Sequence, residues 1–282
     1  MNENGSNADQ IKYWNSQAGA QWVKGRESMD KTLSAFGQLA IDALALSANS
    51  RVLDVGCGCG DTSFSLAEKV INGSVEGVDI SEPMLAHAEE LRLGLGIENV
   101  RFDNADAAVK SFTPQTFDRV FSRFGVMFFD DPVAAFSNIR HSLAPGGKLS
   151  FVCWRPAPEN EWTMVPTKAA LQYVSLPEQV NPNSPGPFAF GDKEYTSSIL
   201  ESAGFSDVVM EAKNLPMCFA ISKNKSLGQQ FAETGPVGRI IASAAEDVRQ
   251  SVIDSMTVAL EAYVADDQVK MDGAVWLVTA SN

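Results

Sequence analysis

Apolar and polar positions follow a repeating strand–helix pattern through the middle of the chain. Short apolar runs predict strands, and longer segments with apolar residues at helical spacing predict the helices between them. We expect strands at residues 51–55, 74–80, 100–104, 117–122 and 149–154, with helices at 62–70, 82–93 and 132–143. Strands that alternate with helices in this way are typical of a parallel sheet covered by helices.

The pattern changes on both sides of this region. The first ten residues are rich in Asn, Gly and Ser and predict disorder, whereas residues 11–46 have helical periodicity. Residues 155–191 contain many Pro and Asn residues, and we interpret them as a long loop with one helix around 163–174. After that loop we expect a helix at 193–203, a strand at 207–212, helical structure over 227–264 and a last strand at 274–280.

A glycine-rich turn, VLDVGCGCG, joins the first strand to the first helix of the repeating region. Its glycines allow a sharp turn and a close approach of a ligand to the backbone, although a tight strand–helix turn alone would explain them. A pyrophosphate would favour the spacing GxGxxG and a turn without acids, but Asp54 and Asp61 flank this turn. Two carboxylates suit a cationic ligand such as S-adenosylmethionine better than a nicotinamide cofactor.

Further acids stand at the ends of the second and third strands. Asp79 could accept hydrogen bonds from ribose hydroxyls, Ile80 offers an apolar face for adenine, and Asp106 could accept from an adenine amino group. Helix capping explains each acid separately, and Ser81 could cap the following helix equally well. Acids at the ends of three successive strands together favour a ligand site, since open α/β sheets bind ligands at that edge.

These segments resemble the class I S-adenosylmethionine-dependent methyltransferases. The series VLDVGCGCG, GVDISEPML, NADA, FDRVFSRFGVMFF and LAPGGKLSFVCW is similar in order and spacing to the bacterial branch that includes ubiquinone/menaquinone-biosynthesis and small-molecule methyltransferases. The resemblance implies a Rossmann-like, doubly wound α/β fold with a seven-stranded sheet whose last strand is antiparallel. Cys59 departs from the family, where Thr or Ser is commoner. The implied cofactor contacts are Gly56 and Gly58 with the amino-acid moiety, Asp79 with the ribose, Asp106 and Ala107 with the adenine, and Ser122 with the methionine end.

The pattern along the chain also divides it into functional segments. We expect an N-terminal helical cap at 1–46, a cofactor-binding core at 47–154, an acceptor loop with a core helix and strand at 155–212, a helical lid insertion at 213–272 and a final core strand at 273–282. Trp22 and Arg26, together with Trp14, could form a lid over the cofactor, or the tryptophans could simply pack into the core.

Arg123 and Arg155 follow the fourth and fifth strands, where the transferable methyl group should point. We predict that one of them positions an anionic acceptor group, and the alternative is an ion pair with an acid such as Asp130 or Glu161. Neither histidine of the chain is a convincing general base. The acceptor is therefore already nucleophilic, so that catalysis is mainly positioning, or a tyrosine or carboxylate of the cap or lid acts as base. The aromatic residues Trp154, Trp162 and Phe188 could line an apolar acceptor pocket.

The composition of the chain limits the kinds of binding partner that we expect. A formal net charge of −13 and the absence of a basic run disfavour nucleic acid. The four cysteines lack zinc-ligand spacing, so we expect no metal, and without an apparent secretory signal or a long apolar stretch we expect a cytoplasmic protein without integral membrane association. The oligomeric state stays open.

The sequence thus favours an enzyme that transfers a methyl group from S-adenosyl-L-methionine to O, C, N or S of a small molecule. Two alternatives remain: a catalytically silent cofactor-binding protein that acts as a partner or sensor, and a nicotinamide-dependent oxidoreductase.

Overall fold

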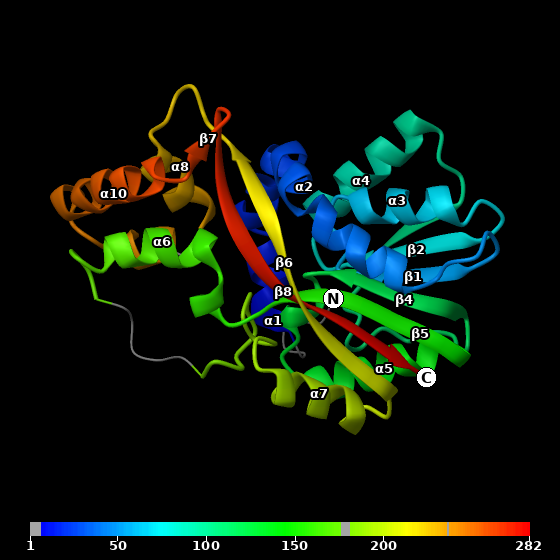
Figure 1. Ribbon diagram of the computed structural model, residues 1–282. Helices are drawn as coiled ribbons and strands as arrows, with labels where there is room; N and C mark the ends of the chain where they lie inside the picture. Colours follow the sequence, from blue (N-terminus) through cyan, green and yellow to red (C-terminus); the bar gives the residue numbers. More distant parts are fainter. Residues whose placement is uncertain (1–6, 176–180, 236) are drawn as a thin grey trace.

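A mixed β-sheet forms the centre of the structure, a computed structural model that describes residues 7–175, 181–235 and 237–282 (Figure 1). The strands lie in the order β3-β2-β1-β4-β5-β8-β6, and β7 adds a short pairing to β8. The first five strands run parallel, whereas β8 is antiparallel to both of its neighbours. This confirms the predicted Rossmann-like sheet with an antiparallel last strand. The strands are β1 (Arg51–Val55), β2 (Ser74–Asp79), β3 (Val100–Asn104), β4 (Phe117–Arg123), β5 (Leu143–Trp154), β6 (Ser206–Ala220), β7 (Val264–Ala265) and β8 (Gln268–Ser281).

Helices cover both faces of the sheet. One face carries α2 (Gln17–Ala43), α3 (Asp61–Lys69) and α4 (Glu82–Leu95), and the other carries α5 (Pro132–Ser142) and α7 (Lys193–Ser202) (Figure 1). Their apolar sides bury against the strands because a doubly wound sheet has no solvent-exposed face.

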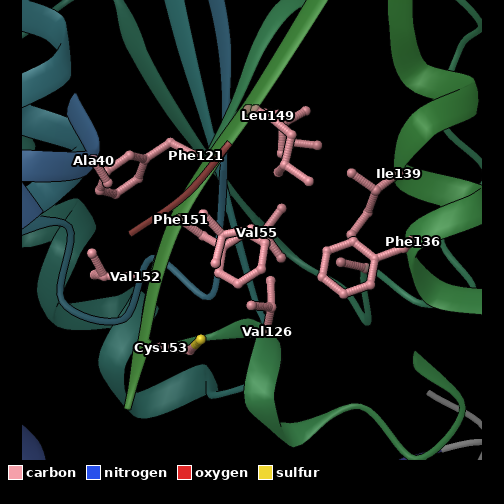
Figure 2. Packing of buried hydrophobic residues seen from close by; sticks show 14 of the residues in the cluster. Ala40, Val55, Phe121, Val126, Phe136, Ile139, Leu149, Phe151, Val152 and Cys153 are labelled. Carbon is pink, nitrogen blue, oxygen red and sulfur yellow. The ribbon is translucent and has the colours of Figure 1, made fainter. Parts of the chain in front are cut away.

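Alternate residues of the central strands pack against the two helical layers. Figure 2 shows Phe151 directed toward Phe136 of α5, while Phe121 and Val152 lie on the side of Ala40 of α2. The rings of Phe136 and Phe151 stack with centroids 5.7 Å apart. These side chains are fully buried, so the sheet supplies a rigid support for the loops at its edge.

Strand β5 begins earlier than the sequence predicted. The helix α5 ends at Ser142, and Leu143 already pairs with Phe117 of β4. The segment Pro145–Gly147 therefore lies inside β5 instead of closing the helix, and Gly146 takes a φ of +73° where the pairing of β4 with β5 shifts register.

The N-terminal region is helical from an earlier point than expected. Residues 1–6 of the segment predicted to be disordered lie outside the described residues, but residues 8–10 belong to α1 (Ala8–Trp14), which Asn7 precedes. The prediction was wrong there because contacts with distant loops, described below, hold α1 in place. Helix α2 begins directly after it, and the side chain of Ser16 accepts a hydrogen bond from the backbone of Ala18.

Strands β6 and β8 extend far beyond the predicted segments and pair continuously from the sheet to the contact of Ala220 with Gln268. Pro216 does not interrupt β6, since β6 is the last strand of the sheet order and an edge strand tolerates a missing N–H.

The tips of these strands support a second apolar core (Figure 1). Phe231, Val252, Met256 and Leu260 are buried in it together with Met271 of β8. The remaining helices are α6 (Glu161–Ala170), α8 (Leu227–Thr234), α9 (Val237–Ile241) and α10 (Glu246–Glu261), with short 3-10 turns at Val126–Phe128 (η1) and Ala157–Glu159 (η2). No helix among the described residues is long and apolar enough to cross a membrane.

Candidate functional site: the carboxyl edge of the sheet

The glycine turn after β1 depends on left-handed backbone conformations. Gly56, Gly58 and Gly60 have φ values of +71°, +56° and +85°, which side chains rarely tolerate. A Cβ added to Gly56 would lie 2.7 Å from Cα of Gly125, so two backbones touch there. At Gly58 the nearest atom would be Cε of Met84 at 3.5 Å, an ordinary contact distance, so Gly58 is less crowded than Gly56.

Asp54 lies under this turn and is fully buried. Its Oδ2 accepts hydrogen bonds from the hydroxyls of Thr62 (2.8 Å) and Ser63 (2.7 Å). Its Oδ1 is buried and has no hydrogen-bond partner among the described residues. Burial raises the pKa of Asp54 to about 6, against the lowering effect of the two hydroxyls. An unpaired buried acceptor is costly, so this carboxylate suits a ligand that brings a cationic donor.

Asp79 ends β2 beside the same turn. Its two carboxylate oxygens accept from the backbone N–H groups of Gly58 and Ser81, each at 2.8 Å. Burial raises the pKa of Asp79, and these backbone hydrogen bonds oppose that rise. The capping alternative for Ser81 is wrong, because its hydroxyl donates to the carbonyl of Trp14 at 2.9 Å and does not cap α4. The partly buried Ile80 follows, as the sequence placed it.

Asp106 and Ala107 follow β3 and are both buried. Asp106 accepts from the backbone N–H of Ala108 at 2.9 Å and from the side-chain amide of Asn7, whose nitrogen lies 2.9 and 3.0 Å from the two carboxylate oxygens. The carbonyl of Ala107 accepts from the amide of Asn138 at 2.9 Å. Asp106 thus shapes the local turn, as in the capping alternative, and also meets a residue from the far N-terminus.

Asp61 does not face the turn as a free carboxylate, which is how the sequence argument treated it. It forms an ion pair with Arg26 of α2, whose Nε lies 2.8 Å from Oδ1 of Asp61. This contact raises the pKa of Arg26. The acid next to the turn is therefore neutralised locally, and Asp54 and Asp79 remain as the buried acids of the site.

Trp22 lies one turn before Arg26 on α2 and is partly buried against the main core. Its ring meets that of Trp14 edge-on at 6.0 Å, and Trp14 in turn meets Phe128 at 5.6 Å. These ring contacts join α1 and α2 to the turn after β4, and the placement of the tryptophans over the cofactor stays a prediction.

Ser122 and Arg123, at the end of β4, are both engaged within the protein. The buried hydroxyl of Ser122 donates to the carbonyl of Val55 at 2.7 Å and accepts from the N–H of Gly125. Nη1 of Arg123 lies 2.7 Å from Oδ1 of Asp30 on α2. Arg123 thus forms an ion pair, but with Asp30 and not with Asp130, and its role toward an acceptor stays a prediction.

Arg155 is also paired. It forms an ion pair with Glu159, and its Nη1 donates to Asn214 of β6 at 2.8 Å. Its guanidinium lies 5.3 Å from the ring centroid of Trp276. The expected partner Glu161 instead accepts from the backbone of Asp272 at 3.0 Å. Neither arginine presents an unpaired guanidinium to an acceptor.

An aromatic cluster lies where β4 and β5 end. The rings of Trp154 and Trp162 are 5.0 Å apart, and those of Trp162 and Phe188 are 6.1 Å apart, so the structure brings the three predicted aromatics together. The sequence analysis missed two members, Phe124 and Phe36. Phe124 stacks on Trp154 at 4.2 Å and 11°, and it holds a φ of +61°, which is unusual for a large side chain. The positive φ of Phe124 could not be predicted from the sequence, because Phe rarely adopts this backbone conformation.

The acids and the aromatic cluster meet at one edge of the sheet. Asp54, Asp79 and Asp106 can hold a cationic adenosine ligand, and the cluster offers an apolar surface after β4. Among the described residues there is no group of His, Cys, Asp and Glu suited to hold a metal ion.

Comparison with known proteins agrees with this geometry. The model of a methyltransferase domain matches residues 52–147. The sequence is 32% identical over 182 residues to demethylmenaquinone methyltransferase of Thermus thermophilus, covering 59% of this chain and 79% of that protein. It is 33% identical over 173 residues to phosphoethanolamine N-methyltransferase 1 of Triticum aestivum, covering 61% of this chain but 31% of that protein.

Two solved structures share the fold. Phosphoethanolamine N-methyltransferase 2 of Haemonchus contortus, in complex with phosphomonomethylethanolamine and S-adenosylhomocysteine, aligns with a TM-score of 0.58 at 19% identity over 96% of this chain and 59% of that one. The cyclase SpnF aligns with a TM-score of 0.58 at 19% identity over 97% of this chain and 96% of that one. At this identity both likenesses concern the fold alone.

The chain belongs to the class I S-adenosylmethionine-dependent methyltransferases, and S-adenosyl-L-methionine is the cofactor of this family. The chain spans about a third of the length of the plant phosphoethanolamine N-methyltransferases that it matches.

Proposed function

We propose that this protein transfers a methyl group from S-adenosyl-L-methionine to a small-molecule acceptor that binds against the aromatic cluster. The single observation that carries the proposal is Oδ1 of Asp54, a buried acceptor atom without a partner among the described residues. A cofactor ammonium would supply the missing donor beneath the glycine turn. The backbone at Gly58 is less crowded than at Gly56, which suits a ligand beside the turn.

Each part of the site then has a task. Asp54 holds the amino-acid end, Asp79 accepts from the ribose hydroxyls while Gly58 and Ser81 fix its orientation, and Asp106 with Ala107 contacts the adenine. Ile80 offers its apolar side chain to the adenine ring. The bound cofactor supplies an electrophilic methyl group on a sulfonium, and the protein aligns the acceptor with it.

Positioning is the main catalytic contribution in this proposal. Arg123 and Arg155 already form ion pairs with Asp30 and Glu159, so we do not assign them the capture of an anionic acceptor group. Phe124, Trp154 and Trp162 instead favour an acceptor with a flat or apolar body. Correct alignment alone can supply much of the rate enhancement when the acceptor is already nucleophilic.

The experiment that tests the proposal follows a labelled methyl group. Purified protein is incubated with methyl-labelled S-adenosylmethionine and the small-molecule fraction of cell extracts, and labelled products are separated by chromatography and mass spectrometry. We expect labelled product with the native protein and none with Asp79→Asn, which keeps the size of the side chain but loses its charge. Trp162→Leu should bind S-adenosylhomocysteine normally yet yield about tenfold less product, the equivalent of about 1.4 kcal/mol.

Two outcomes would contradict the proposal. Tight binding of S-adenosylhomocysteine without product from any extract would favour a silent partner or sensor protein. Binding of NAD in place of S-adenosylhomocysteine would favour an oxidoreductase.

A further inference from the structure

Asn7 reaches from the N-terminal segment to the acid proposed to contact the adenine. Its side chain is buried, its amide nitrogen lies 2.9 and 3.0 Å from the two oxygens of Asp106, and its amide oxygen accepts from the N–H of Asp130 at 2.6 Å. The contact spans 99 positions of sequence, so it belongs to the tertiary structure and not to a local turn.

The residue type at this position meets two requirements at once. Asn7 precedes α1 with a φ of 62°, a conformation that Asn, Asp and Gly tolerate better than other residues. Asn is the member of this group whose side chain both donates and accepts. The N–H of Asp130 holds the amide oxygen and thereby directs the amide NH2 group to Asp106.

Asp106 retains capacity for one more donor. An ionised carboxylate offers about four acceptor positions. Asn7 approaches both oxygens, and the N–H of Ala108 takes a second position on Oδ1. One position on Oδ2 therefore remains for a donor from a ligand.

The other end of the same helix holds the loop after β2. The amide of Asn15 donates to the carbonyl of Ile80 at 2.8 Å and accepts from the N–H of Glu82 at 2.9 Å. Helix α1 thus ties together the two loops that carry Asp79 and Asp106.

We propose that Asn7 is a positioning residue that holds the Asp106 carboxylate as an acceptor and thereby selects a 6-amino over a 6-oxo purine in the cofactor. The proposal rests on the adenine contact of Asp106 given under the proposed function. An amino group donates to a carboxylate, whereas a carbonyl oxygen at the same place repels it. A fixed carboxylate distinguishes the two better than one free to rotate away.

The test compares two ligands on the intact protein. Calorimetry measures the dissociation constants of S-adenosylhomocysteine and of S-inosylhomocysteine, which carries a 6-oxo group. The informative variant is Asn7→Gly, because Gly keeps the left-handed backbone and removes only the amide. Asn99→Ala is the matched control, since its amide donates to the carbonyls of Ala67 and Val70 at the opposite end of β3.

We expect the native protein and Asn99→Ala to prefer the adenosyl ligand by about a hundredfold, near the upper end of what leaving one buried polar group unpaired costs. Asn7→Gly should lower this preference about tenfold, mainly by weaker binding of the adenosyl ligand. Asn7→Asp, which replaces the donor by a second acceptor, should lower it as well.

Three results would overturn the inference. An unchanged preference in Asn7→Gly would make the contact merely structural, and equal weakening of both ligands would make it a general support of the site. Tighter binding of S-adenosylhomocysteine by Asn7→Gly would mean that Asn7 competes for the adenine position. If the native protein binds S-adenosylhomocysteine without any preference, the adenine role of Asp106 fails first, and if it does not bind the ligand, the proposed function fails.

Discussion

Two buried acids of this site, Asp54 and Asp79, have raised pKa values. Burial raises the pKa of Asp54 from 3.8 to about 6 and raises that of Asp79 as well. The folded protein therefore holds a proton on Asp54 between these pH values that the unfolded chain has already released. Protonated Asp54 therefore adds to the free energy of unfolding at low pH, and this contribution is lost as the pH rises through about 6.

Cofactor binding should reverse this preference for the protonated form. A cationic ammonium beside Asp54 favours the carboxylate, so binding lowers its pKa and releases a proton when the pH is below about 6. We expect the dissociation constant of S-adenosylhomocysteine to rise as the pH falls from 7 to 5, by up to about tenfold per unit below the pKa. Calorimetry in buffers of different ionisation enthalpy would measure the proton release.

Asp54→Asn is the control for this pH dependence. The amide cannot ionise, so this variant should bind weakly at pH 7 and change little toward pH 5. An equally steep slope in Asp54→Asn would assign the effect to another group, and Asp79 would be the first to examine.

At the scale of elements, the glycine turn and the strand ends position the site. Asp79 and Asp106 could be placed from the sequence because the apolar runs before them define where β2 and β3 end. The contacts of Arg123 and Asn7 could not be predicted, because they depend on where α1 and α2 cross the sheet. The composition of the N-terminus predicts disorder, whereas the contacts of Asn7 with the distant residues Asp106 and Asp130 hold this segment in place.

The backbone contact at Gly56 predicts a large effect of a small substitution. Gly56→Ala would place a Cβ 2.7 Å from Cα of Gly125 at a φ of +71°, and neither backbone can yield easily. We expect the free energy of unfolding to fall by about 2–4 kcal/mol, from overpacking and left-handed strain together. Chemical denaturation would measure this change.

Gly94→Ala in α4 is the matched control, since a Cβ there has no neighbour within 4 Å. Alanine should stabilise this helix by about 0.5–1 kcal/mol. A free energy of unfolding for Gly56→Ala equal to that of the native protein would show that the turn can relax.

At the scale of the whole molecule, two apolar cores share the strands β6 and β8. The main core holds the cofactor edge, and the second core lies under α6, α8 and α10. The aromatic cluster links them, since Trp162 packs against both. Damage to the second core should therefore affect the acceptor side more than the cofactor side.

Met256→Ala tests this division. Met256 is fully buried in the second core, and its truncation should cost about 2–5 kcal/mol of local stability. We expect protection of α8 and α10 from hydrogen exchange to fall and the Michaelis constant of the acceptor to rise. The dissociation constant of S-adenosylhomocysteine should stay within about twofold, less than 0.5 kcal/mol.

The comparison variant is Leu149→Ala, which also truncates a fully buried apolar side chain, but in the main core. This variant should weaken the binding of both S-adenosylhomocysteine and the acceptor, and it should lower the free energy of unfolding of the whole protein. Equal losses of cofactor affinity in the two variants would contradict the separation of the cores.

The continuous pairing of β6 with β8 also bears on how such a protein can change over evolutionary time. Ala220 and Gln268 are paired neighbours, so the segment between them leaves and re-enters the sheet at one place. A two-residue hairpin turn can close such a pair of antiparallel strands. The helices between these points can therefore be lengthened or exchanged together with the face of α6 that packs on them, while the sheet edge that holds Asp54, Asp79 and Asp106 keeps its framework.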